Sequence, residues 1–292
     1  MKILAADIGG TNTKMGICDE RGNVDQYKEY PTESLKGGPH VIEKLLLQLA
    51  VYADYDAIAI STAGQVNSEE GYIVYANENI PDYTGMKIRD IVENRFKKPV
   101  RVENDVNAAA LGEAYFGAAQ SFQDFLCLTF GTGIGGAIVI DRQIYRGAKG
   151  VAAEFGHIIT HPLPDKRGGE RKPYYESYAS TTALVRMARH VDPECVDGKV
   201  FFGKIREGNE PLQQVLHAWA AEVAVGLASI IHIFNPSAII VGGGVMEQEE
   251  LVRAVEAQTQ DLIMDSFADV KILKASLGNK AGLLGAASLF LR

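Results

Sequence analysis

Short apolar runs alternate with amphipathic segments along most of the chain. The short runs are rich in β-branched and small apolar residues, as is typical of strands. The expected strands are 2–7, 13–18, 24–30, 57–61, 100–103 and 238–241. Between them, apolar residues recur at helical spacing. The expected helices are 41–52, 86–96, 106–116, 176–190, 211–234, 247–262 and 281–291. This alternation predicts an α/β protein with mixed sheets.

Two glycine-rich hairpins far apart in the sequence resemble each other. Both have the order strand, glycine turn, strand and Asp-containing turn, in ILAADIGGTNTKMGICDERGN and in FLCLTFGTGIGGAIVIDRQIY. Gly9 corresponds to Gly131 and Asp19 to Asp141, with the same separation in sequence. The similarity predicts a duplicated core in two lobes, although glycine-rich hairpins can also resemble each other by chance. We expect residues 1–117 with 281–292 to form a smaller lobe, and 118–280 a larger one.

Composition and charge narrow the class of protein. The chain has 292 residues, 47% of them hydrophobic, and 29 basic against 37 acidic side chains give a net charge of -8. It has no general electrostatic reason to bind nucleic acid or an anionic membrane, so a small molecule is the expected partner. Three distant cysteines favour neither disulfides nor a thiolate metal site and fit the cytoplasm. We expect no signal peptide and no membrane-spanning stretch.

The glycine turns suggest phosphate binding. Gly131, Gly133 and Gly136 form a G-x-G-x-x-G pattern, but the turn leads into a strand-like run, not into the helix of a dinucleotide-binding fold, and no P-loop occurs. A glycine turn between two strands can still direct backbone N–H groups at an anion. A third turn, Gly242 to Gly244, would let adenine or ribose approach the backbone, although a tight corner between strand and helix explains it equally well.

Two acidic residues lie where strands end. Asp7 does not precede a helix whose N-terminus it could neutralise, and a carboxylate beside a phosphate site requires a cation, so we assign it to Mg²⁺, bound through water. Asp105 is expected as the N-cap of the helix that follows it. The carboxyl end of a strand in an α/β sheet is also where ligands bind, and a kinase needs a carboxylate there to take the proton of the attacking hydroxyl.

Three side chains further along suit a sugar. Glu154, His157 and Glu176 offer the donors and acceptors that adjacent sugar hydroxyls require. Glu154, His157 and His161 would form a metal site only on a helix, whereas Gly156 and His-Pro favour a strand or irregular chain. We therefore expect His161 to be an exposed loop histidine.

These motifs together resemble the ROK family, bacterial sugar kinases and sugar-responsive repressors with an actin-like fold of two ribonuclease-H-type lobes. Seven motifs occur in the family's order over nearly the whole chain: DIGGTNTK, STAG, ENDVNAAALGEA, FGTGIGGAI, EFGH, ESYAS and VGGGV. The resemblance implies an ATP- and Mg²⁺-dependent kinase of a sugar hydroxyl, with the 6-hydroxyl expected, acting as a homodimer. It assigns Asp105 as the base. It implies sugar contacts from Gly64, Asn79, Asn104, Asp105, Glu154, His157 and Glu176. It implies ATP contacts from Asp7, Gly9, Gly10, Thr11, Asn12, Lys14, Gly131, Thr132, Gly133, Gly243 and Gly244.

Two departures from the family pattern refine these expectations. Many members carry three zinc-binding cysteines before the Glu of ESYAS, but DKRGGERKPYY has none, so we expect no structural zinc. Family repressors carry a helix-turn-helix domain before DIGGT, and here only six residues precede Asp7, so we expect no DNA binding. The altered loop favours a β-glucoside such as cellobiose. The alternatives are glucose, fructose or N-acetylmannosamine and, in another class, a non-catalytic sugar sensor.

Overall fold

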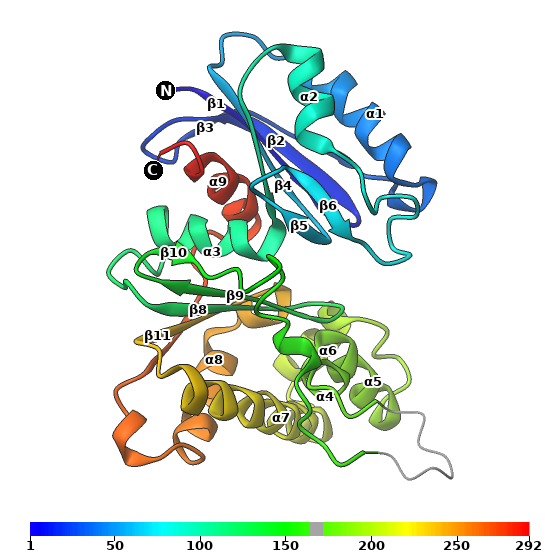
Figure 1. Cartoon of the computed structure of the whole chain (residues 1–292). Helices are drawn as coiled ribbons and strands as arrows, with labels where there is room; N and C mark the ends of the chain where they lie inside the picture. The colour runs from blue at the N-terminus through cyan, green and yellow to red at the C-terminus, as the bar shows by residue number, and fades with distance from the viewer. Residues whose placement is uncertain (164–171, 292) are drawn as a thin grey trace. The chain divides into compact units, whose positions relative to one another are not determined.

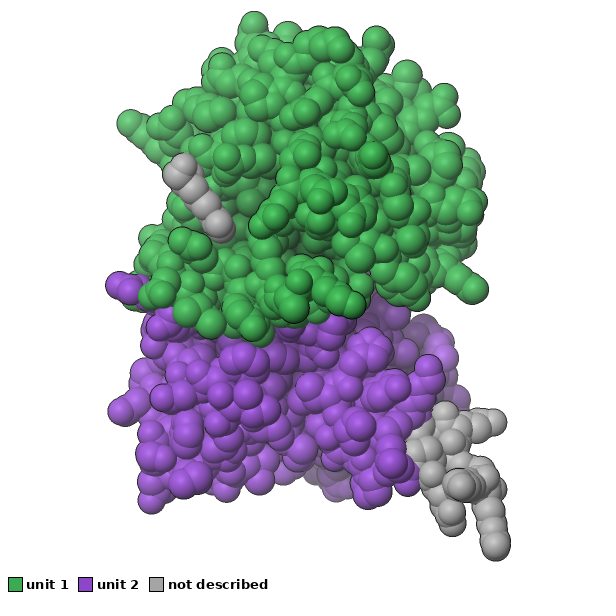
Figure 2. All heavy atoms as spheres, viewed as in Figure 1, with its two compact units in different colours: residues 1–121, 137–152, 276–292 green, residues 122–136, 153–275 purple. Residues whose placement is uncertain are grey.

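The computed structural model describes residues 1–163 and 172–291. The chain divides into two compact units, which are coloured separately in Figure 2. Unit 1 comprises residues 1–121, 137–152 and 276–292, and unit 2 comprises residues 122–136 and 153–275. Each unit therefore combines segments that are distant in the sequence.

Unit 1 contains a five-stranded mixed sheet of order β3-β2-β1-β4-β7. Its strands are β1 (Ile3–Ile8), β2 (Asn12–Cys18), β3 (Val24–Pro31), β4 (Ala57–Thr62) and β7 (Val100–Asn104). β1, β2 and β3 pair antiparallel, whereas β1 pairs parallel with β4 and β4 with β7. A small antiparallel hairpin is formed by β5 (Gln65–Asn67) and β6 (Tyr72–Tyr75). The sequence pattern did not predict this hairpin.

Helices cover both faces of this sheet (Figure 1). They are α1 (Gly38–Leu49), α2 (Ile88–Phe96), α3 (Asp105–Phe116) and α9 (Ala281–Ser288). Because successive strand residues point to opposite faces, Leu4 and Ala6 of β1 join the core with α1 and α2. Ile3 and Ala5 join a second core with α9. The carboxyl ends of β1, β4 and β7 consequently lie side by side at one sheet edge.

The second sheet repeats the strand order of the first. Its order is β10-β9-β8-β11-β12, so β8, β9 and β10 correspond to β1, β2 and β3, and β11 and β12 correspond to β4 and β7. Its strands are β8 (Phe125–Phe130), β9 (Ile134–Ile140), β10 (Gln143–Ile144), β11 (Ala238–Gly242) and β12 (Lys271–Lys274). β8 pairs parallel with β11 and β11 with β12. Gly9 and Gly131 lie in equivalent turns, which confirms the predicted duplication.

The helices of unit 2 surround its longest member, α7. They are α4 (Glu176–Ala179), α5 (Thr181–Val191), α6 (Gly198–Arg206), α7 (Glu210–Phe234) and α8 (Glu249–Gln260). Short 3₁₀ turns occupy Phe155–His157 and Gly244–Glu247. The predicted helix 176–190 is interrupted, since Ser180 is extended and its hydroxyl accepts the Ala183 N–H, capping α5. The sequence pattern did not predict α6 or β12.

α7 is apolar for a structural reason. Among the described residues it is the one helix whose length and composition suffice to cross a membrane, although half of its most apolar stretch is buried in the fold. We expected no apolar stretch long and charge-free enough to span a membrane, and by length and composition α7 contradicts that expectation. One side of α7 packs against α5 and α8 and buries Trp219, Val223 and Leu227 completely. A helix buried in a protein core can therefore be as apolar as a membrane span.

Candidate functional site

Asn104 and Asp105 lie where β7 ends and α3 begins. Asn104, not Asp105, is the N-cap: its side-chain oxygen accepts the backbone N–H groups of Val106 (3.0 Å) and Asn107 (3.1 Å). The prediction of Asp105 as N-cap was wrong because Asn104 keeps the extended backbone that a cap requires, while Asp105 is already helical. The Asn104 amide also donates to Asp105 Oδ1 at 2.9 Å. The neighbouring amide thus orients the Asp105 carboxylate.

The environment of Asp105 suits a group that exchanges protons near neutral pH. Burial raises its pKa to about 7, and the negative charge of Asp7 adds to the rise. Hydrogen bonds from Val106 N–H and from Asn104 act in the opposite direction. A carboxylate with a pKa near the working pH can accept a proton and release it again, as a general base must.

Asp7 lies at the end of β1 in the same unit. Its Oδ1 accepts the Ser61 hydroxyl at 2.7 Å, and Lys14 Nζ lies 3.8 Å from Oδ2. Burial raises the pKa of Asp7, while Ser61 and Lys14 lower it. A methyl group added at Gly282 would come within 2.7 Å of the carboxyl, so the first turn of α9 lies against Asp7. The helix N-terminus beside this carboxylate belongs to a distant segment, because α9 arrives from the far end of the sequence.

The first glycine turn connects β1 to β2. Gly9 N–H donates to the Asn12 carbonyl at 3.1 Å, and the buried Thr32 donates its hydroxyl to the Gly9 carbonyl at 2.7 Å. Gly10 and Thr11 are exposed at the tip. The Asn12 side chain donates to Glu29, and Lys14 points toward Asp7. The turn is thus held from behind by Thr32 with its tip open to solvent.

Gly64 and Asn79 are placed differently. Gly64 has a φ of +95°, and its carbonyl accepts the Asn104 side-chain amide at 2.9 Å, which brings it to the β7 end. Asn79 is exposed on the segment after β6, where its N–H donates to the Asn77 side chain at 3.0 Å. The structure therefore joins Gly64 to Asn104 and Asp105, but gives Asn79 no bond to them.

The glycine turns of unit 2 follow two adjacent parallel strands. Gly131 N–H donates to the Gly133 carbonyl, and the Gly131 carbonyl accepts Thr181 N–H from α5, both at 2.9 Å. The Thr132 carbonyl accepts the Thr182 hydroxyl at 2.9 Å. Gly243, with a φ of +98°, packs against the backbone of Phe130, and Gly244 opens a 3₁₀ turn. The two turns thus meet at one sheet edge of unit 2.

Glu176 connects two of the predicted motifs within unit 2. Its Oε2 accepts the Ile134 N–H at 3.3 Å, next to Gly133. A methyl group on Gly133 or Gly156 would come within 2.5 Å or 2.9 Å of that oxygen, so both glycines are required for its approach. The side chains of Glu154 and His157 are exposed, and His157 Nδ1 lies 3.8 Å from Glu154 Oε2. The carboxylate of Glu176 therefore bridges the GTG turn and the EFGH segment.

His161 is only partly exposed, unlike the exposed loop histidine that was expected. Its ring stacks on Tyr178 with centroids 3.4 Å apart, and its Nε2 lies 3.4 Å from Glu222 of α7. Within residues 1–163 and 172–291, no group of three or more His, Cys, Asp or Glu is arranged to hold a metal. The segment in which family members carry zinc-binding cysteines lies largely outside the described residues, at 164–171.

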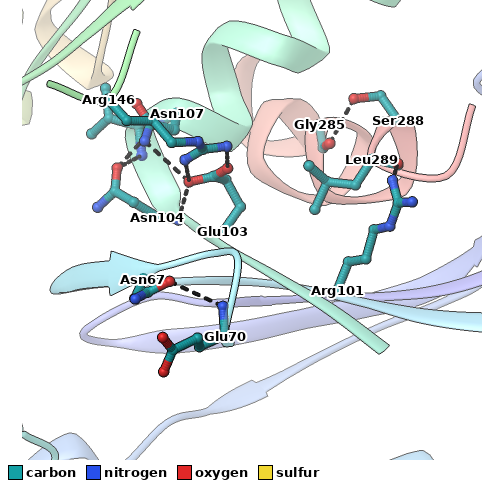
Figure 3. Close-up of polar contacts among 11 residues, drawn as sticks. Asn67, Glu70, Arg101, Glu103, Asn104, Asn107, Arg146, Gly285, Ser288 and Leu289 are labelled. Carbon is teal, nitrogen blue, oxygen red and sulfur yellow. Dashed lines mark hydrogen bonds and ion pairs between the residues drawn. The ribbon is translucent and has the colours of Figure 1, made fainter. Parts of the chain in front are cut away.

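Sequence reasoning missed a buried ion pair beside Asp105. Glu103, completely buried at the end of β7, accepts two hydrogen bonds from Arg146, at 2.7 Å and 3.1 Å (Figure 3). The signal for Glu103 was its place directly before Asn104 and Asp105. Arg146 gives no local signal, because its contact with Glu103 spans 43 residues of sequence.

Comparison with known proteins places this architecture in a family. The chain is 34% identical over 310 residues to a glucokinase from Streptomyces coelicolor, covering 98% of this chain and 96% of that protein. It is 33% identical over 297 residues to a beta-glucoside kinase from Klebsiella pneumoniae, covering 99% and 96%. A crystal structure of a ROK family glucokinase from Streptomyces griseus in complex with glucose and AMPPNP superposes with a TM-score of 0.85 at 33% identity, covering 99% of both chains.

These similarities confirm the predicted fold class, an actin-like α/β architecture with a duplicated core. The ROK family model matches residues 3–292, nearly the entire sequence. The chain therefore belongs to the ROK family.

Proposed function

We propose that this protein transfers the γ-phosphate of ATP to a sugar hydroxyl, with Asp105 as the base that takes the hydroxyl proton. The chain is an ATP-dependent sugar phosphotransferase, the enzyme class of its relatives named glucokinase and beta-glucoside kinase. The observation that carries the role of Asp105 is its geometry: a carboxylate at the end of β7, oriented by Asn104, with a pKa raised to about 7 by burial. Phosphoryl transfer requires such a positioned base.

The two glycine turns and Asp7 are the groups that we propose to bind ATP. Gly10 and Thr11 at the exposed tip in unit 1, and Thr132 beside Gly131 at the exposed tip in unit 2, offer backbone N–H groups for phosphate oxygens. Lys14 adds a positive charge, and Gly9, Asn12 and Gly133 complete the turns. Gly243 and Gly244, without side chains, are the proposed contact for adenosine.

The surroundings of Asp7 fit a Mg²⁺ ion bound through water. The charge of Asp7 raises the pKa of Asp105, so the two carboxylates repel each other, and a divalent cation would relieve that repulsion. Lys14, at 3.8 Å, compensates Asp7 only in part. When bound, Mg²⁺ would neutralise phosphate charge beside this carboxylate.

Polar side chains from each unit are the proposed sugar contacts. In unit 1 these are Asn79, Asn104 and Asp105, together with the backbone of Gly64, and Asn104 already binds both Gly64 and Asp105. In unit 2 they are Glu154, His157 and Glu176, of which the first two have exposed side chains. Carboxylates, amides and a neutral imidazole together provide donors and acceptors for adjacent hydroxyls.

A β-glucoside such as cellobiose is the proposed acceptor, at the 6-hydroxyl. The cysteine-free segment 165–175 and the beta-glucoside kinase relative support this choice. The glucokinase relatives favour glucose instead, which makes a free hexose or N-acylhexosamine the second candidate. A non-catalytic sugar sensor would require that Asp105 serve no chemistry. A cytoplasmic homodimer remains a prediction.

A coupled assay of ADP release tests this function. With Mg-ATP and cellobiose, glucose, fructose, mannose or N-acetylmannosamine, we expect turnover with one sugar and a loss of about 10²- to 10⁴-fold in kcat for Asp105→Asn. Asp90→Asn, an exposed acid in the first turn of α2, is the matched control and should keep wild-type kcat. Calorimetry should show that Asp105→Asn still binds the sugar. Sugar binding without turnover of any sugar would favour the sensor.

A further inference from the structure

The buried carboxylate of Glu103 lies behind the proposed catalytic residues. Its Oε1 accepts the backbone N–H of Asn104 and the side-chain amide of Asn107, each at 3.0 Å (Figure 3). Asn104 and Asn107 are also joined to each other, because Asn104 Oδ1 accepts the Asn107 N–H at 3.1 Å. Glu103 therefore fixes the last residue of β7 and the first turn of α3 together.

Arg146 supplies the opposite charge. Its two terminal nitrogens face the two oxygens of Glu103, the bidentate arrangement in which guanidinium and carboxylate bind most strongly. A fully buried carboxylate left without such a partner is strongly destabilised. Arg146 follows β10, and its carbonyl accepts the Ala152 N–H at 3.2 Å. The ion pair thus attaches the loop 146–152 to the end of β7, 43 residues away in sequence.

The contacts continue from this pair to Asp105. Glu103 holds the backbone N–H of Asn104, and the side-chain amide of the same residue donates at 2.9 Å both to Asp105 Oδ1 and to the Gly64 carbonyl. Val106 N–H donates to Asn104 Oδ1 at 3.0 Å and to Asp105 Oδ1 at 2.9 Å. The groups that orient Asp105 are therefore anchored through Asn104 on the carboxylate that Arg146 neutralises.

We infer that the Glu103–Arg146 ion pair is a positioning element for the base Asp105. Among the described residues no hydrogen bond joins the pair to Asp105 itself; Glu103 holds the backbone of Asn104 and thereby sets the direction of the catalytic carboxylate. This role rests on the proposed kinase function. It predicts that loss of the pair lowers the rate of the chemical step without weakening ATP binding, since the side-chain hydrogen bonds of Glu103 in the described part of unit 1 go to Asn104, Asn107 and Arg146 and not to the turn at Gly9.

Four variants test the positioning role: Arg146→Met, Glu103→Gln, Arg146→Lys and the double variant Glu103→Gln/Arg146→Met. We expect kcat per sugar-binding site to fall at least about tenfold in Arg146→Met and Glu103→Gln, because small displacements of a catalytic group cost this much or more. KM for ATP should stay within about twofold of wild type. Arg146→Lys keeps a cation and should recover part of the loss. Counting sites by calorimetry removes any effect of inactive protein.

Arg142→Met is the matched control. Arg142 lies on the turn between β9 and β10 and donates to the carbonyls of Ala114 and Gln120, at the opposite end of α3 from Asp105. It should keep kcat within about twofold of wild type even where stability falls. If Arg146→Met does not fold, the double variant, which leaves no unpaired charge, provides the same measurement.

The outcomes separate the two proposals. A kcat per site within about twofold of wild type in Arg146→Met or the double variant overturns the positioning role, as does an equal loss in Arg142→Met. A wild-type protein that phosphorylates no sugar overturns the kinase function itself, and the positioning role with it. Loss in Arg146→Met and Glu103→Gln with partial recovery in Arg146→Lys supports the inference.

Discussion

At the scale of single residues, the chemistry depends on how the fold treats a few carboxylates. Asp105, Asp7 and Glu103 lie in one unit, yet each has a different partner: Asn104, Ser61 and Arg146 respectively. Glu103 is neutralised by a bidentate ion pair, whereas Asp105 and Asp7 repel each other. Burial, with the charge of Asp7 added, therefore raises the pKa of Asp105, and no cation pairs with it among the described residues.

The pH dependence of the reaction follows from this difference. The pKa of Asp105 is raised to about 7, and only the ionised carboxylate can accept a proton. We expect kcat/KM to be maximal above pH 7 and to fall about tenfold per pH unit as the pH drops below the pKa. A pH profile of kcat/KM at saturating Mg-ATP measures this. Activity that stays constant down to pH 5 would contradict the assignment of Asp105 as the base.

A glycine beside Glu176 gives a second prediction at this scale. In Gly133→Ala, the new methyl group would come within 2.5 Å of Glu176 Oε2 and displace the carboxylate from its bond with Ile134 N–H. The end of a side chain can move, so we expect KM for the sugar to rise about tenfold or more while stability changes by less than about 1 kcal/mol.

The matched control for that substitution is Gly203→Ala in α6, where an added methyl group meets no atom within 4 Å. It should leave KM unchanged and stabilise the fold by about 0.5–1 kcal/mol, because alanine favours a helix. Steady-state kinetics and urea denaturation distinguish the two variants. An unchanged sugar KM in Gly133→Ala would show that the position of Glu176 does not matter for sugar binding.

At the scale of elements, unit 1 is held together by the contact of α3 with α9. The two helices approach so closely that a methyl group on Gly285 would overlap the Ala108 carbonyl. The chain enters α9 through Ser276 and Leu277, whose backbone N–H groups each donate to the buried Glu113 of α3 at 2.9 Å. This attachment brings the first turn of α9 to Asp7.

Glu113 is therefore expected to be a stability residue. Glu113→Gln replaces an acceptor oxygen by an NH₂ group that faces backbone donors, so we expect a loss of about 2–4 kcal/mol in the free energy of unfolding. Glu43→Gln, on the exposed face of α1, is the control and should change stability by less than about 0.5 kcal/mol. Urea denaturation measures both. A Glu113→Gln variant as stable as wild type would show that the α9 attachment contributes little.

At the scale of the whole molecule, the sequence by itself determined the repeated architecture. The strands around Gly9 and Gly131 were predicted because short apolar runs and glycine turns are local patterns, and the two sheets follow the same strand order. Local signals also identified the ends of β1 and β7, where Asp7 and Asp105 lie. Two local predictions were wrong. The N-cap of α3 is Asn104 and not Asp105, and the predicted helix 176–190 is interrupted at Ser180, because both Asn104 and Ser180 have an extended backbone.

Only the tertiary structure decided which distant groups meet. Arg146 reaches Glu103, the first turn of α9 reaches Asp7, and Glu113 binds Ser276 across 163 residues of sequence. None of these contacts has a periodic or local signature, because each depends on how separate elements pack. The sequence thus determined which residue types are available for catalysis, and packing determined the charge and orientation with which they act.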